Sequence, residues 1–342
     1  MRIRDALKYR NSNFAIVALN SFCNCRCSMC ELWKHDFRID IPKFVANLDK
    51  LSANNFRILQ LTGGEPTLLQ ELPDIVRAAR EKGFLIQVMT NGTTMTDELA
   101  ERLAEAGTNI VCVSVDHYDD AIASEYRKFP NIGARIKETV RLLKKHGISV
   151  CSTTLLTRHN YRDIEDVIRF VNNELGMPFS FCNPENTGNY FLTADEKKAS
   201  NLTKDELIHT IERILEMKEN GASILSTKAH IKNTLAFLKS GKSKYLCKAG
   251  KNVVFIDWDM NVFPCFKKPK MCGLSELASD KLHDLHCDEC TTQCFREPSI
   301  FYYRLGKLEY MSDVNVLFGA LKGAVLAKPR PAASTLYSEQ NK

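Results

Sequence analysis

Four cysteines lie within eight residues near the start of the chain, in Ser21-Phe22-Cys23-Asn24-Cys25-Arg26-Cys27-Ser28-Met29-Cys30. Cys23, Cys27 and Cys30 have x3 and x2 spacing, which lets a short loop direct three thiolates to one iron–sulfur cube. Such a cube keeps one iron without a protein ligand, and that iron can bind a substrate or cofactor. A cluster held by four cysteines usually only transfers electrons. The spacing therefore indicates chemistry performed at a cluster.

A zinc site is the alternative, because zinc also binds clustered thiolates. Zinc sites more often combine two thiolate pairs, and the triad lacks that arrangement. Cys25 fits neither ligand spacing, and we interpret it as a bystander.

The elements that must position these cysteines follow an alternating pattern of short apolar runs and amphipathic stretches. The expected strands are Phe14–Leu19, Arg57–Thr62, Phe84–Thr90, Asn109–Val115, Ile148–Leu155 and Pro178–Cys182. The expected helices are Lys43–Ala53, Leu72–Lys82, Thr96–Ala106, Ile132–Lys145 and Arg162–Leu175. Six βα units predict an α/β fold with parallel strands and right-handed crossovers. Periodicity alone leaves two topologies open, a doubly wound sheet and a partial barrel.

Composition limits the class of protein. The 342 residues are 44% hydrophobic and 26% charged, which is ordinary for a globular protein. No apolar run reaches 18 residues, and residues 1–5 do not begin a signal peptide. With 13 cysteines and no secretion signal, we expect a cytoplasmic protein with a metal or redox role. The net charge of +6 is modest, and we expect no nucleic-acid partner.

The triad placed after a first strand resembles the signature of the radical S-adenosylmethionine (SAM) superfamily. The resemblance implies a partial (β/α)6 TIM-like barrel. It also implies that SAM chelates the open iron and is cleaved reductively to a 5′-deoxyadenosyl radical, which abstracts hydrogen from a substrate. A flavodoxin- or ferredoxin-type electron donor is then the expected partner.

Strand ends supply the expected SAM pocket, because the carboxyl edge carries the sites of such folds. Gly63-Gly64-Glu65-Pro66 follows the second strand and matches the family motif that meets the SAM amino group. Ser114 and Asp116 end the fourth strand, and the resemblance gives Asp116 the ribose hydroxyls. His117 replaces the glycine that the family often has there, and Arg127 matches loosely an arginine that meets the SAM carboxylate.

Two further features of this half of the chain stay open. Thr90-Asn91-Gly92 ends the third strand, where a plain turn and a ligand contact are both compatible with the sequence. Cys112, Cys151 and Cys182 lie in expected strands and are interpreted as packing residues.

Cysteines return in the last third of the chain, as Cys247, Cys265, Cys272, Cys287, Cys290 and Cys294. The group resembles the SPASM or twitch appendage of radical SAM enzymes. It departs from the full SPASM pattern in having six cysteines, with Met260 where a glycine is usual. We expect one auxiliary 4Fe–4S cluster on Cys247, Cys265, Cys287 and Cys290, with Cys272 and Cys294 as substitutes. A zinc knuckle that uses His283 or His286 is the alternative.

The sequence thus predicts four segments: a radical SAM core over residues 1–190, a helical connector over 191–245, an iron–sulfur domain over 246–310, and an amphipathic helix with a flexible tail over 311–342. The expected function is oxidation or electron transfer on a small molecule, lipid or peptide. Two alternatives are a peptide maturase that forms cross-links and a non-catalytic iron–sulfur carrier or sensor. The SAM motif argues against the second.

The last segment carries a separate hypothesis. From Val314 to Lys328, helical spacing gathers apolar residues on one face, and Lys328 and Arg330 follow. We favour docking of this face on the barrel, with peripheral contact to a membrane as the alternative.

Overall fold

The computed structural model describes residues 12–183 and 202–304. Its centre is a nine-stranded sheet in the order β6-β5-β4-β3-β2-β1-β7-β8-β9. The first six strands are neighbours in chain order, and every pair among them is parallel. A doubly wound sheet reverses its order at a switch point, and these six strands do not. The prediction of a partial (β/α)6 barrel is therefore confirmed.

The strands lie close to their expected positions. Their bounds are β1 Asn13–Ala18, β2 Phe56–Thr62, β3 Leu85–Thr90, β4 Ile110–Ser114, β5 Ser149–Leu155 and β6 Phe181–Cys182. All six run in the same direction, so their carboxyl ends share one edge. The segments that follow β1 to β5 therefore meet there, including the cysteine loop and the Gly-Gly-Glu-Pro motif.

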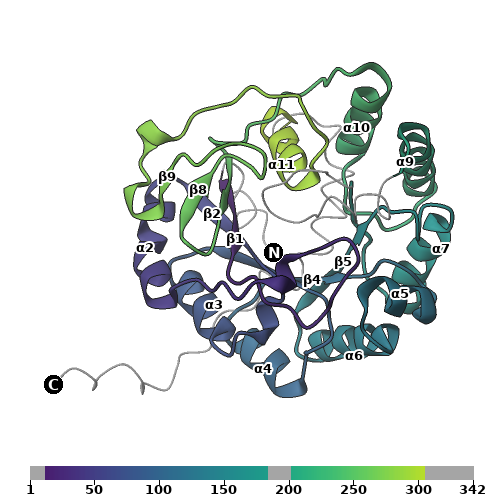
Figure 1. Cartoon of the computed structure of the whole chain (residues 1–342), viewed down its shortest axis with the longest axis horizontal. Coiled ribbons are helices and arrows are strands. Elements are labelled where there is room, and N and C mark those ends of the chain that lie inside the picture. The colour runs from purple at the N-terminus through teal and green to yellow at the C-terminus, as the bar shows by residue number, and fades with distance from the viewer. Residues whose placement is uncertain (1–11, 184–201, 305–342) are drawn as a thin grey trace.

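Helices α2, α3, α4, α6 and α7 form an arc around the strands (Figure 1). Their bounds are α2 Ile41–Ala53, α3 Leu72–Glu81, α4 Asp97–Glu105, α6 Ile132–Lys145 and α7 Ile164–Arg169. In α2, the Asp40 side chain accepts a hydrogen bond from the Lys43 amide at the N-terminus, and Phe44, Leu48 and Leu51 are buried. Alternating strand residues such as Leu59 and Leu61 join the same core.

Helix α5 was not predicted. It covers Asp120–Arg127, where the sequence pattern suggested no element. Asp119 caps it by accepting hydrogen bonds from the amides of Ala121 and Ile122, and Lys128 ends it with a φ of +51°. Eight residues are too short for a clear apolar period, so pattern analysis had little to detect. The predicted helix over 162–175 is an α-helix that continues as a π-helix, η3, over Phe170–Glu174.

The last third of the chain extends the sheet. Strand β7, Val253–Ile256, pairs parallel with β1, and β8, Asn261–Phe263, and β9, Cys272–Gly273, add antiparallel strands. Helices α9, Lys204–Glu219, and α10, Lys228–Ser240, lie within residues 191–245, where a helical connector was expected. Helix α11 covers Gln293–Arg304 and lies over the same end of the molecule as α10 (Figure 1).

The predicted boundaries at residues 190, 245 and 310 stay predictions. The first and third, and the amphipathic stretch over 314–328, lie outside the described residues. Within residues 12–183 and 202–304, no helix has the length and apolar character needed to cross a membrane.

Leu48→Ala tests the packing of α2 on the sheet. Leu48 is fully buried, so the truncation is expected to lower the free energy of unfolding by about 2–5 kcal/mol. Urea unfolding measures the loss. Lys50→Ala, at an exposed position on the same helix, is the control and should change stability little. Equal effects of the two substitutions would contradict this packing.

Candidate functional site

The cysteine loop is held by the end of α5. The Arg26 amide donates to the Arg127 carbonyl at 3.2 Å, and the Ser28 amide donates to the Tyr126 carbonyl at 3.1 Å. The last carbonyls of a helix have no hydrogen-bond partner within the helix, and the amides of a loop have no partner in regular secondary structure. The loop amides and the helix carbonyls therefore satisfy each other's hydrogen bonds. Helix α5, which the sequence did not predict, thus holds the cysteine loop, which it did predict.

The glycines of Gly63-Gly64-Glu65-Pro66 pack against the same loop from the other side. A Cβ atom on Gly64 would lie 2.2 Å from the carbonyl oxygens of both Ser21 and Phe22, and one on Gly63 would lie 2.4 Å from Asn20. The Gly64 amide donates to the Asn20 carbonyl at 2.8 Å. We expected these glycines to admit a ligand. In the structure they admit the protein's own chain just before Cys23.

Glu65 is fully buried and bound by the protein. Its Oε1 accepts hydrogen bonds from the Thr67 amide at 3.1 Å, the Thr67 hydroxyl at 2.5 Å and the Thr90 hydroxyl at 2.8 Å. Its Oε2 accepts from the Asn91 amide at 2.6 Å. Burial raises the pKa of Glu65, and these four donors oppose that rise. The carboxylate thus ties the ends of β2 and β3 together, and its role toward SAM stays a prediction.

Two of the three triad thiols, those of Cys23 and Cys27, interact with Cys25. Cys23 and Cys30 are half-buried, and Cys27 is buried. The Cys25 thiol is within hydrogen-bonding reach of both Cys23 and Cys27, and this contact lowers the pKa of both, against the effect of burial. The positive charge of Arg127 further lowers the pKa of Cys27, and Asp116 opposes this in part. The pKa of Cys25 itself is raised. The neighbours of Cys23 and Cys27 therefore favour the thiolate form that binds iron.

Asp116 and Arg127 contact each other. The Arg127 Nε lies 2.7 Å and its Nη2 lies 2.6 Å from Asp116 Oδ2, and both residues are buried. The Leu155 amide donates to Asp116 Oδ1 at 3.3 Å. The sequence analysis gave the two residues separate ligands, the ribose and the SAM carboxylate. The structure places them in one ion pair beside Cys27, and both ligand assignments stay predictions, as does that of Ser114 at the end of β4.

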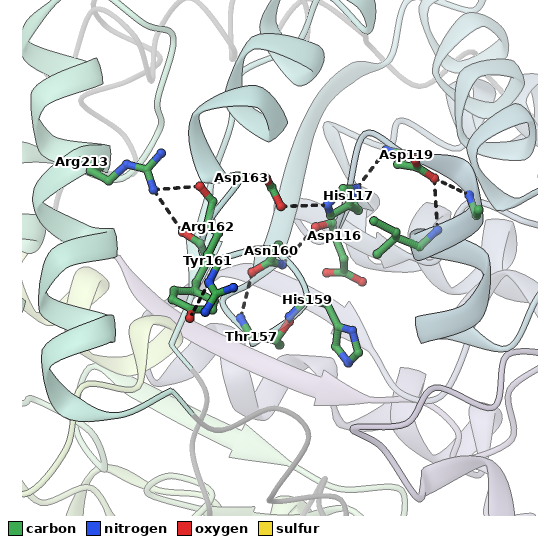
Figure 2. A network of polar contacts seen from close by, with 12 residues as sticks. Asp116, His117, Asp119, Thr157, His159, Asn160, Tyr161, Arg162, Asp163 and Arg213 are labelled. Atoms are coloured by element: carbon green, nitrogen blue, oxygen red, sulfur yellow. Dashed lines mark hydrogen bonds and ion pairs between the residues drawn. The ribbon is translucent and has the colours of Figure 1, made fainter.

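The loops after β4 and β5 are joined by side chains (Figure 2). Asn160 donates to the carbonyls of Asp116 at 3.0 Å and Leu155 at 2.8 Å. His117 accepts from the Asp119 amide at 2.9 Å through Nδ1, and its Nε2 lies 3.6 Å from Asp163 Oδ2. His117 does not have a positive φ, so the turn does not need the glycine that the family often has.

Two residues at this edge had no assigned role in the sequence analysis. His159 is exposed, and its ring lies 4.6 Å from that of Tyr126. Asn91, for which a plain turn and a ligand contact were both left open, is buried and donates to Cys23 Sγ at 3.6 Å. For Asn91 the available signal was its position directly after a strand that ends at the carboxyl edge.

The C-terminal cysteines form a second group. The Cys247 amide donates to the Cys287 carbonyl at 2.7 Å, and Cys265 lies close enough to Cys287 and Cys290 for their charges to raise its pKa, although burial is the larger cause. Burial raises the pKa of Cys247 to about 11. The structure thus brings together the four residues that the spacing selected. Their role as ligands stays a prediction.

The two substitutes differ in position. Cys294 packs against the same apolar cluster as Cys247, Cys265 and Cys287, and Cys30 of the triad also packs against it. Cys272 lies in β9 and belongs to the other apolar cluster of the core. Met260 has a φ of +58°, so this turn keeps the left-handed conformation that favours the usual glycine.

In residues 12–183 and 202–304 no three His, Cys, Asp or Glu side chains are arranged as ligands of one metal ion. The triad offers three thiols on one short loop, and thiolates are the ligands of iron–sulfur clusters. Cys23 Sγ also accepts hydrogen bonds from the Cys25 amide at 3.4 Å and from Asn91, which suits a thiolate bound to a cluster.

Comparison with known proteins agrees with this geometry. Residues 17–171 match the family model described as the radical SAM superfamily. The chain is 26% identical over 271 residues to a tungsten-containing aldehyde ferredoxin oxidoreductase cofactor-modifying protein of Pyrococcus furiosus, covering 74% of this chain and 71% of that protein. It is 25% identical over 226 residues to the Fe-coproporphyrin III synthase of Methanosarcina barkeri, covering 64% of this chain and 56% of the synthase.

A solved structure has the same fold. Streptococcus suis SuiB, bound to its precursor peptide SuiA, has a TM-score of 0.64 and 16% sequence identity. The alignment covers 82% of this chain and 67% of SuiB. At this identity the likeness concerns the fold, and the chain spans only part of each of the three proteins.

Gly64→Ala tests the seat of the cysteine loop. The added methyl group overlaps two carbonyl oxygens, so we expect a loss of about 3 kcal/mol in the free energy of unfolding and reduced iron binding. Gly147→Ala is the control, because its Cβ would meet nothing within 4 Å and only its φ of +75° is strained, at about 1 kcal/mol. Urea unfolding and iron content measure both variants. Normal iron binding by Gly64→Ala would contradict the contact.

Proposed function

Since this chain belongs to the radical SAM superfamily, we propose that Cys23, Cys27 and Cys30 hold the 4Fe–4S cluster at which SAM is cleaved. The observation that carries the proposal is the convergence of three strand ends and α5 on the cysteine loop. A cluster held by these residues would supply the electron for reductive cleavage of SAM ahead of hydrogen abstraction from the substrate. A flavodoxin- or ferredoxin-type protein is the proposed electron donor.

The chain's own residues have three tasks in this scheme. Backbone contacts from Tyr126 and Arg127 hold the loop in place over the carboxyl edge. The buried Arg127 guanidinium places a positive charge beside Cys27, which offsets the negative charge of the thiolates. Asp116 in turn holds that guanidinium through two nitrogens, which fixes its orientation.

The second cysteine group is proposed to hold one auxiliary 4Fe–4S cluster, through Cys247, Cys265, Cys287 and Cys290. Cys294 packs nearby and is the first substitute. Strand β7 lies between Cys247 and Cys265 in the chain and pairs with β1, which precedes the triad. The auxiliary group is thereby fixed relative to the first by sheet hydrogen bonds. The proposed role of this cluster is in oxidation of the substrate or in electron transfer.

The substrate is proposed to be an organic cofactor or its precursor. One relative described above is named for modifying a cofactor and the other for making Fe-coproporphyrin III. Their sequence identity to this chain, 25–26%, exceeds the 16% of SuiB. A peptide is the second candidate, because SuiB has been solved with a precursor peptide.

Iron content tests the two cluster assignments. Anaerobic reconstitution is expected to give about eight irons per chain, because each 4Fe–4S cluster contributes four. Replacing Cys23, Cys27 and Cys30 by alanine should leave about four and abolish release of 5′-deoxyadenosine with dithionite. Replacing Cys247, Cys265, Cys287 and Cys290 should also leave about four but retain that release.

Cys25→Ala is the matched control for the triad, since it removes a thiol of the same loop and should keep about eight irons. One zinc at the C-terminal group, with no second cluster, would disprove the auxiliary assignment. Release of 5′-deoxyadenosine by the triple variant would disprove the triad assignment.

A substrate panel tests the proposed class. Iron coproporphyrin III, a metal-binding organic cofactor and a cysteine-containing peptide are each added to the reduced protein with SAM. Because hydrogen abstraction draws SAM cleavage forward, a substrate should raise 5′-deoxyadenosine release above the uncoupled rate. We expect stimulation by a cofactor or its precursor, and stimulation by the peptide alone would reverse the assignment.

A further inference from the structure

Asn91 reaches the cysteine loop from the end of β3. It is 6% exposed, and its backbone amide donates to Glu65 Oε2 at 2.6 Å, which fixes the start of its side chain. Its Nδ2 lies 2.9 Å from Asn24 Oδ1 and 3.6 Å from Cys23 Sγ. A side chain from a different strand therefore contacts the first cysteine of the triad.

The orientation of the Asn91 amide group is determined by its partners. Oδ1 accepts two hydrogen bonds from Thr93, from the amide at 2.9 Å and from the hydroxyl at 2.6 Å. Only the oxygen of an asparagine side chain can accept from both donors, so the nitrogen must face Asn24 and Cys23. Its two hydrogens match the two acceptors.

Asn24 closes a ring of hydrogen bonds. Its Nδ2 donates to the Thr93 hydroxyl at 2.7 Å, that hydroxyl donates to Asn91 Oδ1, and Asn91 Nδ2 donates back to Asn24 Oδ1. Each polar atom of the ring has a matching partner, which makes the arrangement rigid. The N–H that faces Cys23 is therefore held in place by the protein.

We propose that Asn91 raises the reduction potential of the cluster on Cys23, Cys27 and Cys30 by donating a hydrogen bond to the Cys23 sulfur. The inference rests on the proposed function of the triad. Reduction adds negative charge, part of which resides on the cysteine sulfurs. An N–H aimed at such a sulfur stabilises the reduced state more than the oxidised one, so the potential rises. Asn91 thus acts through the Cys23 sulfur and makes the cluster easier to reduce before SAM is cleaved.

Asn91→Ala in the full-length, anaerobically reconstituted protein tests the proposal. The cluster is followed by electron paramagnetic resonance during a redox titration, through the signal that changes when SAM is added. We expect its midpoint potential to shift to a more negative value, and 5′-deoxyadenosine release to fall at a fixed donor potential. Asn24→Ala is the matched control, because it opens the same ring but leaves the N–H that faces Cys23. Its potential should shift less.

A second measurement applies to the wild-type protein and does not depend on how a variant folds. With ¹⁵N in the asparagine side chains, hyperfine spectroscopy of the reduced cluster should detect a weakly coupled nitrogen, and Asn91→Asp should abolish that coupling. An unchanged midpoint potential in Asn91→Ala with an intact cluster, or no asparagine coupling in the wild type, would overturn the inference. Absence of any SAM-sensitive signal in the wild type would instead refute the proposed function.

Discussion

The mutual satisfaction of backbone groups between α5 and the cysteine loop is the constraint on which the site depends. A loop that presents three thiols cannot also form regular secondary structure, so its amides need partners elsewhere. The end of a helix leaves carbonyls without internal partners. Placing the end of α5 beside the loop solves both problems with the Tyr126 and Arg127 carbonyls. The Asp116–Arg127 ion pair then holds the same helix end against the end of β4.

That ion pair is expensive to bury, and hydrophobic replacements of such pairs often stabilise a protein. The neighbours of the Asp116–Arg127 pair suggest what a buried ion pair contributes at this position. Arg127 lies beside Cys27, and Asp116 is bound by the Leu155 amide from the next strand. Arg127 therefore favours the Cys27 thiolate, with Asp116 opposing it in part, and the pair joins α5, β4 and β5 in one arrangement that apolar residues could not reproduce.

Much of the fold could be predicted from the sequence because the strands are short apolar runs separated by amphipathic helices. The cysteine spacing and the Gly-Gly-Glu-Pro motif likewise indicated the site, because both are local patterns. Helix α5 was missed because its eight residues form little more than two turns, too few for a clear apolar period. The pairing of β7 with β1 could not be predicted, because the local sequence of Val253–Ile256 does not indicate which strand it pairs with.

Side-chain roles were harder to predict than positions. Asp116 and Arg127 were each identified, but their contact depends on how α5 turns back to the end of β4, and the sequence contains no direct sign of that geometry. The contact of Asn91 with Cys23 depends in the same way on the packing of β3 beside the loop. Gly63 and Gly64 were expected to face a ligand, because a glycine indicates that another group comes close to the backbone. The sequence does not show whether that group is a ligand or the protein's own chain.

The position of β7 has a consequence for how the protein is made. Strand β1 has β2 on one side and β7 on the other, and Phe14 pairs with Val253. Ribosomes add about 5–20 residues per second, so the roughly 240 residues between these partners take about 12–48 s to synthesise. During that time one edge of β1 has no strand beside it, and the adjoining cysteines emerge long before their sheet is complete. Such distant pairing also slows folding, because the chain must close a long loop before the contact forms. A nascent chain therefore carries β1 with one unpaired edge for tens of seconds, and avoiding wrong strand pairing at that edge during this interval is a requirement set by the topology of the sheet.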